Sequence, residues 1–348
     1  MTQILLKGVA KTFPRFSLGP VDFEVKSGEF FGIFGPPSSG KTSILKAILG
    51  LLPIDGGMIT FDGQDTAQIP VESRNVAMVF QNLSLFPHMT GRENIIYPLI
   101  ERNFSKDEIE RRLAEVAEVL HISHILHKNP SQMSGGERQR IGLGRAFIGD
   151  SRAILMDEPI AALDARLREE MRVELKRLQR EKNQTFIYVS HDEEEVLAIS
   201  DRVAVIIDGK IEQVGTPAEV YDQPANMAVA RLIGSPPMNF FKGSGDASTG
   251  TFSSNLFNAT VQVAGIPSGE VTLGVRPEDL HLSDSGIAGK VLTLEPLGSY
   301  TIINAEIGGQ PVKIRASGQV SMAEGTSIHV SADTRHIHIF GPDGNKVG

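Results

Sequence analysis

Short apolar runs alternate with longer stretches of helical periodicity along the N-terminal part of the chain. The runs Phe30–Phe34, Ala153–Asp157 and Thr185–Val189 are rich in apolar and β-branched or aromatic residues and predict buried strands. Thr42–Leu52 and Asp164–Lys182 place apolar residues at helical spacing and predict amphipathic helices. This alternation predicts an α/β fold, in which helices cover a mostly parallel sheet.

The pattern changes after Ser235. Alternating runs such as Ala259–Val263, Lys290–Leu294 and Thr301–Ala305 are short and are separated by glycines. Runs of this length and spacing are typical of a small all-β barrel or sandwich. The C-terminal part of the chain is therefore expected to be a separate β domain.

We accordingly predict two domains, over residues 1–235 and 236–348 of the 348-residue chain. Within the first, residues 82–147 are mainly helical in pattern and interrupt the strand order, which predicts a helical subdomain. Ser105 and Glu108 have the spacing of a capping box and predict the start of one of its helices.

Gly35–Thr42 reads Gly-Pro-Pro-Ser-Ser-Gly-Lys-Thr and lies between a predicted strand and a predicted helix. A glycine-containing turn at a helix start directs backbone N–H groups and the positive end of the helix dipole at one place, where a polyphosphate fits. Lys41 would reach the β- and γ-phosphates, and the Thr42 hydroxyl would ligate magnesium. An ordinary Gly-Pro-Ser turn is the alternative, and we favour the phosphate loop because both flanking elements are predicted.

Two further polar groups follow predicted strands. Asp157 and Glu158 end the apolar run from Ala153, where Asp157 could hold magnesium and Glu158 could polarise an attacking water. His191 follows the run that ends at Val189, at the edge where open α/β sheets place their ligands. Taken singly, an acidic turn and a solvated loop histidine explain these residues as well.

The motifs taken together, in this order, resemble the nucleotide-binding subunit of an ATP-binding cassette (ABC) transporter. In that resemblance Phe13 stacks on adenine, Gln81 is the Q-loop glutamine, and Ser134–Glu137 is the signature sequence. Asp157 and Glu158 close the Walker B motif, Ala162–Asp164 is the D-loop, and His191 is the switch histidine. The fold implied is a P-loop ATPase domain followed by a small OB-like, or TOBE, domain.

The resemblance implies ATP and Mg²⁺ as cofactors. Its catalytic residues would be Glu158, His191, Lys41 and Gln81. Its magnesium ligands would be Thr42, Gln81 and Asp157. Its nucleotide-binding residues would be Phe13, Gly35, Pro36, Pro37, Ser38, Ser39, Gly40, Lys41, Thr42, Ser43, Ser134, Gly135, Gly136, Glu137 and Asp164.

Several later segments resemble the ATPases of maltose-type and glycerol-phosphate importers. These are Gly209–Pro217, Pro224–Asn226, Ile233–Pro236, Met238–Phe240 and the TOBE-like Leu273–Asp279. The resemblance implies import of a sugar, polyol or glycerol phosphate. The ATPase of a polyamine or ferric-iron importer is an alternative, and a soluble cassette ATPase acting on DNA or ribosomes is a more distant one.

Three motifs depart from the family pattern. Pro37 removes a backbone donor from the phosphate loop, and Ser38 replaces a glycine. Glu137 replaces the more frequent glutamine and adds a negative charge not far from where a partner's γ-phosphate would lie. The D-loop has Ala161 and Ala162 where serine or asparagine is usual. We still expect an active ATPase, with pairing to a different ATPase subunit as an alternative.

Composition narrows the setting. The net charge of −8 argues against a nucleic-acid partner, and the absence of cysteine leaves no thiolate chemistry. No apolar run approaches the ~20 residues that span a bilayer. The resemblance therefore implies a peripheral protein at the cytoplasmic face of the inner membrane. Its implied partners are two integral membrane permease subunits, indirectly an extracytoplasmic solute-binding protein, and a second ATPase subunit in a homodimer or heterodimer.

Overall fold

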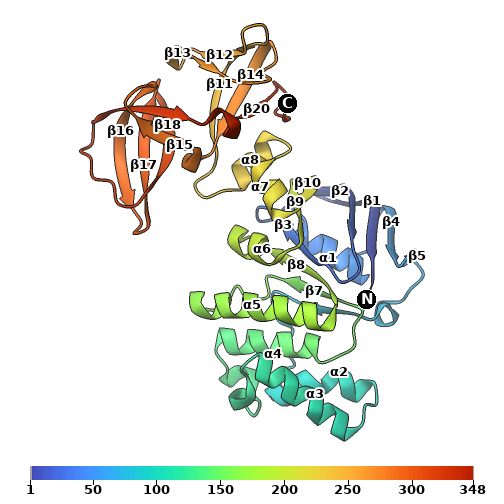
Figure 1. Ribbon diagram of the computed structural model, residues 1–348. Coiled ribbons are helices and arrows are strands. Elements are labelled where there is room, and N and C mark those ends of the chain that lie inside the picture. Colours follow the sequence, from blue (N-terminus) through green and yellow to red (C-terminus); the bar gives the residue numbers. More distant parts are fainter. Residues whose placement is uncertain (1, 348) are drawn as a thin grey trace. The chain divides into compact units, whose positions relative to one another are not determined.

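The computed structural model describes residues 2–347. The chain divides into two compact units, and the division falls between Ala218 and Glu219 (Figure 1). The domain boundary expected at residue 235 stays a prediction. The α/β class of the first unit and the β class of the second are confirmed.

The first unit contains two sheets. One is antiparallel, in the order β2-β1-β4-β5, and the other has the order β10-β9-β3-β8-β7-β6, in which only β10 runs antiparallel to its neighbour. The strands are β1 (Ile4–Phe13), β2 (Phe16–Val25), β3 (Phe30–Phe34), β4 (Gly56–Phe61), β5 (Gln64–Asp65), β6 (Val76–Val79), β7 (Ala153–Asp157), β8 (Thr185–Ser190), β9 (Arg202–Ile207) and β10 (Lys210–Gly215).

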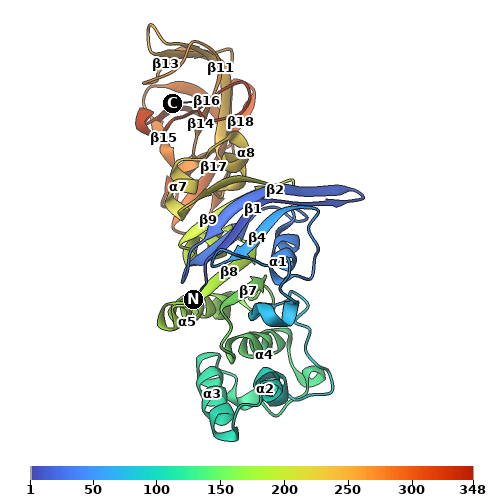
Figure 2. The same ribbon diagram turned by 90° about the vertical axis from the view of Figure 1, so that its right-hand side faces the viewer.

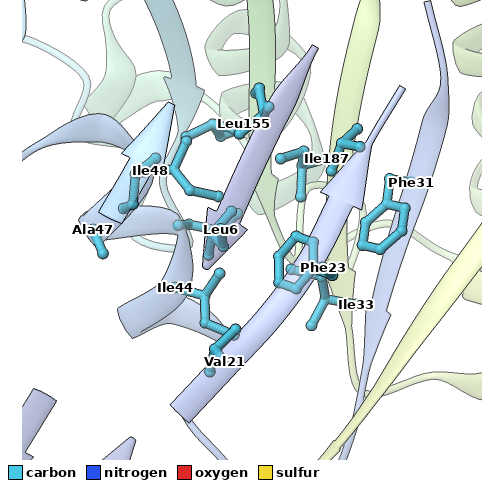
Figure 3. Packing of buried hydrophobic residues seen from close by; sticks show 14 of the residues in the cluster. Leu6, Val21, Phe23, Phe31, Ile33, Ile44, Ala47, Ile48, Leu155 and Ile187 are labelled. Atoms are coloured by element: carbon cyan, nitrogen blue, oxygen red, sulfur yellow. The ribbon is translucent and has the colours of Figure 1, made fainter. Parts of the chain in front are cut away.

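The core of this unit forms where helix α1 (Lys41–Leu49) packs with both sheets. Figure 3 shows Ile44 and Ile48 of α1 beside Leu6 and Val21 of the antiparallel sheet and Leu155 of the parallel sheet, all of them buried. The helix starts one residue earlier and ends three residues earlier than predicted. It ends because Gly50 adopts a left-handed conformation, with φ 92°, and closes the last turn.

Successive residues of β3 serve opposite faces of the parallel sheet. Phe31 and Ile33 belong to the core that includes α1, whereas a Cβ at Gly32 would meet Val196 of α6 (Glu193–Ile199) and Ser200, the C-cap of that helix. Helix α6 therefore covers the other face of this strand. The longer α5 (Ala165–Lys182) packs against α6, and it starts one residue later than predicted because Asp164 is its N-cap.

The bounds expected for the helical subdomain, residues 82–147, stay a prediction. The subdomain lies between β6 and β7 in the order of the chain, and Figure 2 shows α2, α3 and α4 together at the foot of the view. Its helices are α2 (Gly91–Glu101), α3 (Lys106–Val119) and α4 (Gly135–Phe147). The predicted capping box at α3 is only half correct. The Ser105 hydroxyl accepts the Glu108 N–H, but the Glu108 carboxylate turns to Arg111 and Arg112, because two guanidinium groups lie within its reach.

The second unit is built around a core shared by two five-stranded sheets, β13-β12-β11-β14-β20 and β15-β19-β16-β17-β18. Its strands are β11 (Asn239–Asp246), β12 (Thr251–Ser254), β13 (Phe257–Gln262), β14 (Gly269–Val275), β15 (Leu280–Ser283), β16 (Ile287–Pro296), β17 (Tyr300–Ile307), β18 (Gln310–Ser317), β19 (Ser327–Ala332) and β20 (His338–Phe340). Two short helices precede these strands, α7 (Pro217–Asp222) and α8 (Met227–Leu232). The first two residues of α7, Pro217 and Ala218, belong to the first unit.

Candidate functional site

The loop between β3 and α1 has the backbone of a phosphate cradle. Ser38 and Gly40 adopt left-handed conformations, with φ of 63° and 104°, and a Cβ at Gly35 would collide with the carbonyl oxygen of Ile206. No side chain caps the N-terminus of α1. The first N–H groups of the helix thus point into the loop, where an anion would satisfy them.

The basic and hydroxyl groups of the loop are held in place by its own atoms and by the Walker B strand. Lys41 Nζ donates to the carbonyl oxygens of Gly35 and Pro36, both at 2.8 Å. Burial lowers the pKa of Lys41, against the opposing effect of the Glu158 and Asp157 charges. Thr42 Oγ1 donates to Asp157 Oδ2 at 2.8 Å, and burial raises the pKa of Asp157. The predicted lysine, threonine and aspartate therefore lie together.

Glu158 connects the two remaining predicted catalytic residues. Its Oε2 accepts from Gln81 Nε2 at 3.0 Å, and its Oε1 lies 2.7 Å from His191 Nδ1. Its backbone is left-handed, with φ 50°, and its N–H donates to the Val189 carbonyl at 2.8 Å. Parallel strands β6, β7 and β8 end side by side, and this places Gln81, Glu158 and His191 at one edge of the sheet.

A cleft of about 330 Å³ opens between these groups. It is lined by Phe13, Phe16, Pro37, Ser38, Ser39, Gly40, Lys41, Thr42, Ser43, Gln81 and Glu158. Phe16 was not predicted, although it follows Phe13 by three residues and its ring centroid lies 6.0 Å from that of Phe13. A second aromatic in the same β-turn was the signal in the sequence that could have identified it.

The signature residues lie elsewhere on the surface of the unit. Ser134 is exposed and caps α4, where its hydroxyl accepts the Glu137 N–H at 3.2 Å. The described residues that line the cleft include none of the signature residues Ser134, Gly135, Gly136 and Glu137, and they do not include Asp164. Asp164 caps α5 by accepting the Leu167 N–H at 3.0 Å. The nucleotide contacts expected of these residues stay predictions.

Glu137 is turned back onto its own helix. Its carboxylate accepts from Lys128 Nζ at 2.8 Å and from the Ser134 N–H at 2.7 Å. Lys128 and then this N–H lower the pKa of Glu137 to about 2. Lys128 was not predicted to contribute, and its ammonium group balances the negative charge that Glu137 adds to the signature sequence.

These features define a P-loop nucleoside triphosphatase with an inserted helical subdomain. They are the strand, glycine-containing loop and helix of the phosphate cradle, and beside it the two carboxylates and the glutamine that follow neighbouring strands. Family models support and refine this class. The ABC transporter model matches residues 18–161, the MalK OB fold domain model matches 234–280, and the TOBE domain model matches 273–340.

Full-length relatives carry the comparison further. The chain is 40% identical over 350 residues to the sn-glycerol-3-phosphate import ATP-binding protein UgpC of Ruegeria sp. (strain TM1040), covering 99% of each chain. It is 38% identical over 357 residues to UgpC 3 of Agrobacterium fabrum, covering 100% of each. The chain belongs to the ATP-binding proteins of ABC transporters, and it is an ATPase.

Solved structures agree with this assignment for the first unit. The dimeric structure of a bacterial ABC transporter cassette matches with a TM-score of 0.58 and 30% identity, over 62% of this chain and 98% of that chain. A dimeric post-hydrolysis state of the same cassette, bound to ADP and phosphate, matches with a TM-score of 0.57 and 29% identity.

Proposed function

We propose that this chain hydrolyses ATP to drive the import of a sugar, polyol or glycerol phosphate through separate membrane subunits. The support is the name and full-length similarity of the import ATP-binding relatives, together with the MalK OB fold and TOBE domain models that match the C-terminal unit. The partners in this proposal are two integral membrane permease subunits and an extracytoplasmic solute-binding protein. Among the described residues, no helix is both long and apolar enough to cross a bilayer. In this proposal those partners hold the chain at the cytoplasmic face of the inner membrane.

The donor atoms of the site fit magnesium. The Thr42 hydroxyl and the Asp157 carboxylate are 2.8 Å apart, and Gln81 faces the same cleft. Gln81 Nε2 donates to Glu158, so its amide oxygen is the atom that would serve as a ligand. Hydroxyl, carboxylate and amide oxygens are the ligands that Mg²⁺ prefers. When bound, this ion would reduce the negative charge of the phosphates during transfer.

The phosphate loop fits the polyphosphate of ATP. Ser39 Oγ is buried and makes no hydrogen bond within the described part of the chain. Lys41 Nζ donates to two carbonyl oxygens of the loop. With ATP bound it would donate to phosphate oxygens instead, because a charged acceptor makes a stronger hydrogen bond with an ammonium group. The rings of Phe13 and Phe16 line the same cleft and offer apolar surface for the adenine base.

The contact of Glu158 with Gln81 and His191 is the observation that carries the proposed chemistry. A carboxylate held from both sides, at 3.0 Å and 2.7 Å, is positioned to take the proton of a water that attacks the γ-phosphate. His191 would remain beside the transferred group and stabilise its charge. Glu158 is thus proposed as the general base.

The cleft contains only one side of the proposed nucleotide site. Ser134 is exposed and the first residues of α4 are partly exposed, and none of them lines the cleft. They would bind the γ-phosphate of a nucleotide held by a second subunit. The related cassettes were solved as dimers. We therefore propose a dimer that closes on ATP and opens after hydrolysis, with a homodimer as the first assembly to test.

The first experiment measures magnesium-dependent ATPase activity of the purified chain against protein concentration. A rate that rises more steeply than linearly supports a homodimer, and Glu158→Gln should abolish it. Glu169→Gln, at an exposed position of α5, is the matched control and should keep the activity. A Glu158→Gln variant as active as the original chain would reject Glu158 as the base.

Transport is tested separately in cells that express the chain with its cognate membrane subunits. Uptake of labelled sn-glycerol 3-phosphate, a disaccharide and spermidine is compared between the original chain and Glu158→Gln. Loss of glycerol-phosphate or sugar uptake supports the proposed substrate class. Loss of spermidine uptake alone would move the chain to the polyamine alternative.

A further inference from the structure

Arg145, on α4, contacts the loop that follows Gln81. Its guanidinium donates from Nη2 to the Leu83 carbonyl at 2.7 Å and from Nη1 to the Ser84 carbonyl at 2.8 Å. The ring of Phe86 lies under the guanidinium, 5.6 Å away at its centroid. Burial lowers the pKa of Arg145. Because this half-buried guanidinium donates to two consecutive carbonyl oxygens, it fixes the path of the loop.

The loop that Arg145 holds is strained. Leu83 and Ser84 are consecutive non-glycine residues with left-handed backbones, at φ of 62° and 43°. This turn directs both carbonyls at α4. Gly142 of α4 faces Leu83, and a Cβ there would lie 3.4 Å from Leu83 Cδ2, an ordinary packing distance. Without its contacts to α4, the turn would relax toward commoner backbone conformations.

A second side chain of α4 holds the other side of the same contact. Gln139 is 2% exposed, and its Nε2 donates to the Glu158 carbonyl at 3.1 Å while its Oε1 accepts the Ala162 N–H at 2.9 Å. Glu158 is itself left-handed, with φ 50°. Gln139, Gly142 and Arg145 follow each other at intervals of three residues, so they lie on one side of α4.

We propose that α4 positions the catalytic groups of its own chain, with Arg145 and Gln139 as positioning residues that hold Gln81 and Glu158 in register for ATP hydrolysis. Arg145 fixes the turn beyond Gln81, and Gln139 fixes the backbone of Glu158. The contact between Gln81 Nε2 and Glu158 Oε2 at 3.0 Å depends on both. The inference rests on the proposed roles of these two residues.

Arg145→Lys tests the first of these contacts. Lysine keeps the charge but cannot donate in two directions at once from a planar group. We expect kcat for ATP to fall by about 10-fold to 100-fold, with the Kd for ATP changed by less than about threefold, because the base is misplaced while the phosphate loop is intact.

Arg140→Lys is the matched control. Arg140 lies on the same helix and also donates to two consecutive carbonyls, those of Leu120 at 3.3 Å and His121 at 2.9 Å, away from the cleft. It should lose thermal stability to a similar extent and keep kcat within about twofold. An equal loss of kcat in both variants would overturn the proposal, since it would reflect general loosening of α4.

A rescue variant separates positioning from stability. Glycine adopts the left-handed conformation without strain, so Ser84→Gly added to Arg145→Lys should restore a large part of the lost kcat. Measurements are made well below the melting temperature of each variant. No recovery of kcat in the folded double variant would contradict the role assigned to the strained turn.

Gln139→Glu tests the contact between Gln139 and the Glu158 carbonyl. It also provides a test of the proposal if Arg145→Lys does not fold. Glutamate keeps the size and the acceptor for Ala162 but opposes the Glu158 carbonyl with another acceptor. It should lower kcat without raising the Kd for ATP. The proposal is wrong if folded Arg145→Lys and Gln139→Glu both keep kcat within about twofold. An original chain that binds ATP but does not hydrolyse it alone would instead reject the self-sufficient homodimer of the proposed function and point to a different partner subunit.

Discussion

Replacing Glu137 by glutamine tests how the unusual signature residue acts. In the folded chain Lys128 Nζ and the Ser134 N–H hold the carboxylate at 2.8 Å and 2.7 Å, and they lower its pKa from 4.5 to about 2. A glutamine keeps an acceptor for the N–H but loses the ion pair and the negative charge at the N-terminus of α4. Glu137→Gln should therefore destabilise the first unit.

The magnitude follows from the pKa and the exposure. A carboxyl group whose pKa falls from 4.5 to about 2 stabilises the fold by at most about 3–4 kcal/mol. The Lys128 side chain is 31% exposed and that of Glu137 is 16% exposed, so solvent screens the pair. We expect about 1 kcal/mol, or a melting temperature lower by about 2–4 °C.

The pH dependence gives the sharper test. Because the folded pKa lies below the unfolded one, this stabilisation is fully present above pH 4.5 and is lost as the pH falls through about 2. Urea unfolding should show a constant difference between original and Glu137→Gln from about pH 5 to 8, shrinking by about half or more near pH 3. A difference that grows at low pH, or none at pH 7, would refute the reasoning. The control Glu169→Gln should change stability by less than about 0.5 kcal/mol.

Three other substitutions follow from single contacts. Ser38→Gly relieves a left-handed residue of the phosphate loop and should raise stability by about 1 kcal/mol in thermal unfolding; an unchanged or lower melting temperature would contradict this. Arg74→Met leaves the buried carbonyls of Ala47, Ile48, Thr66 and Ile69 without their guanidinium, now at 2.8–3.3 Å, and should cost about 3 kcal/mol in urea unfolding. Phe16→Ala should raise the KM for ATP by about 10-fold with kcat little changed, because the ring lines the cleft; a fall in kcat alone would exclude a binding role.

Elements that depend on local patterns were predictable. The strands that end at Phe34, Asp157 and Ser190 are short apolar runs, and each is completely buried. The helix from Lys41 was predicted to run to Leu52, but its apolar spacing continues past the glycine that ends it. Residues that follow parallel strands converge because such strands end at one edge, so the order of motifs was sufficient to place Lys41, Thr42, Asp157 and Glu158 together.

Side-chain directions between distant segments were not predictable. Lys128 and Glu137 are nine residues apart, and only the turn before α4 brings the ammonium to the carboxylate. Arg145 reaches carbonyls that precede it by about 60 residues in the sequence. No periodicity encodes such contacts, because they depend on how the helical subdomain packs. The left-handed backbones of Ser38 and Glu158 were not predictable either, because neither residue is a glycine, the residue type that usually marks this conformation.

Helix α4 joins two parts of the proposed reaction. Its N-terminus displays Ser134, which is exposed and would meet the nucleotide of a second subunit. Further along, Gln139 and Arg145 hold the loops that carry Glu158 and Gln81 of the same chain. Since a helix is stiff over this length, a displacement of α4 on dimer closure would reach both loops at once. A subunit would therefore align its own general base, Glu158, when its signature residues bind the ATP of its partner. Because this alignment would need the dimer, the ATPase rate should rise more steeply than linearly with protein concentration.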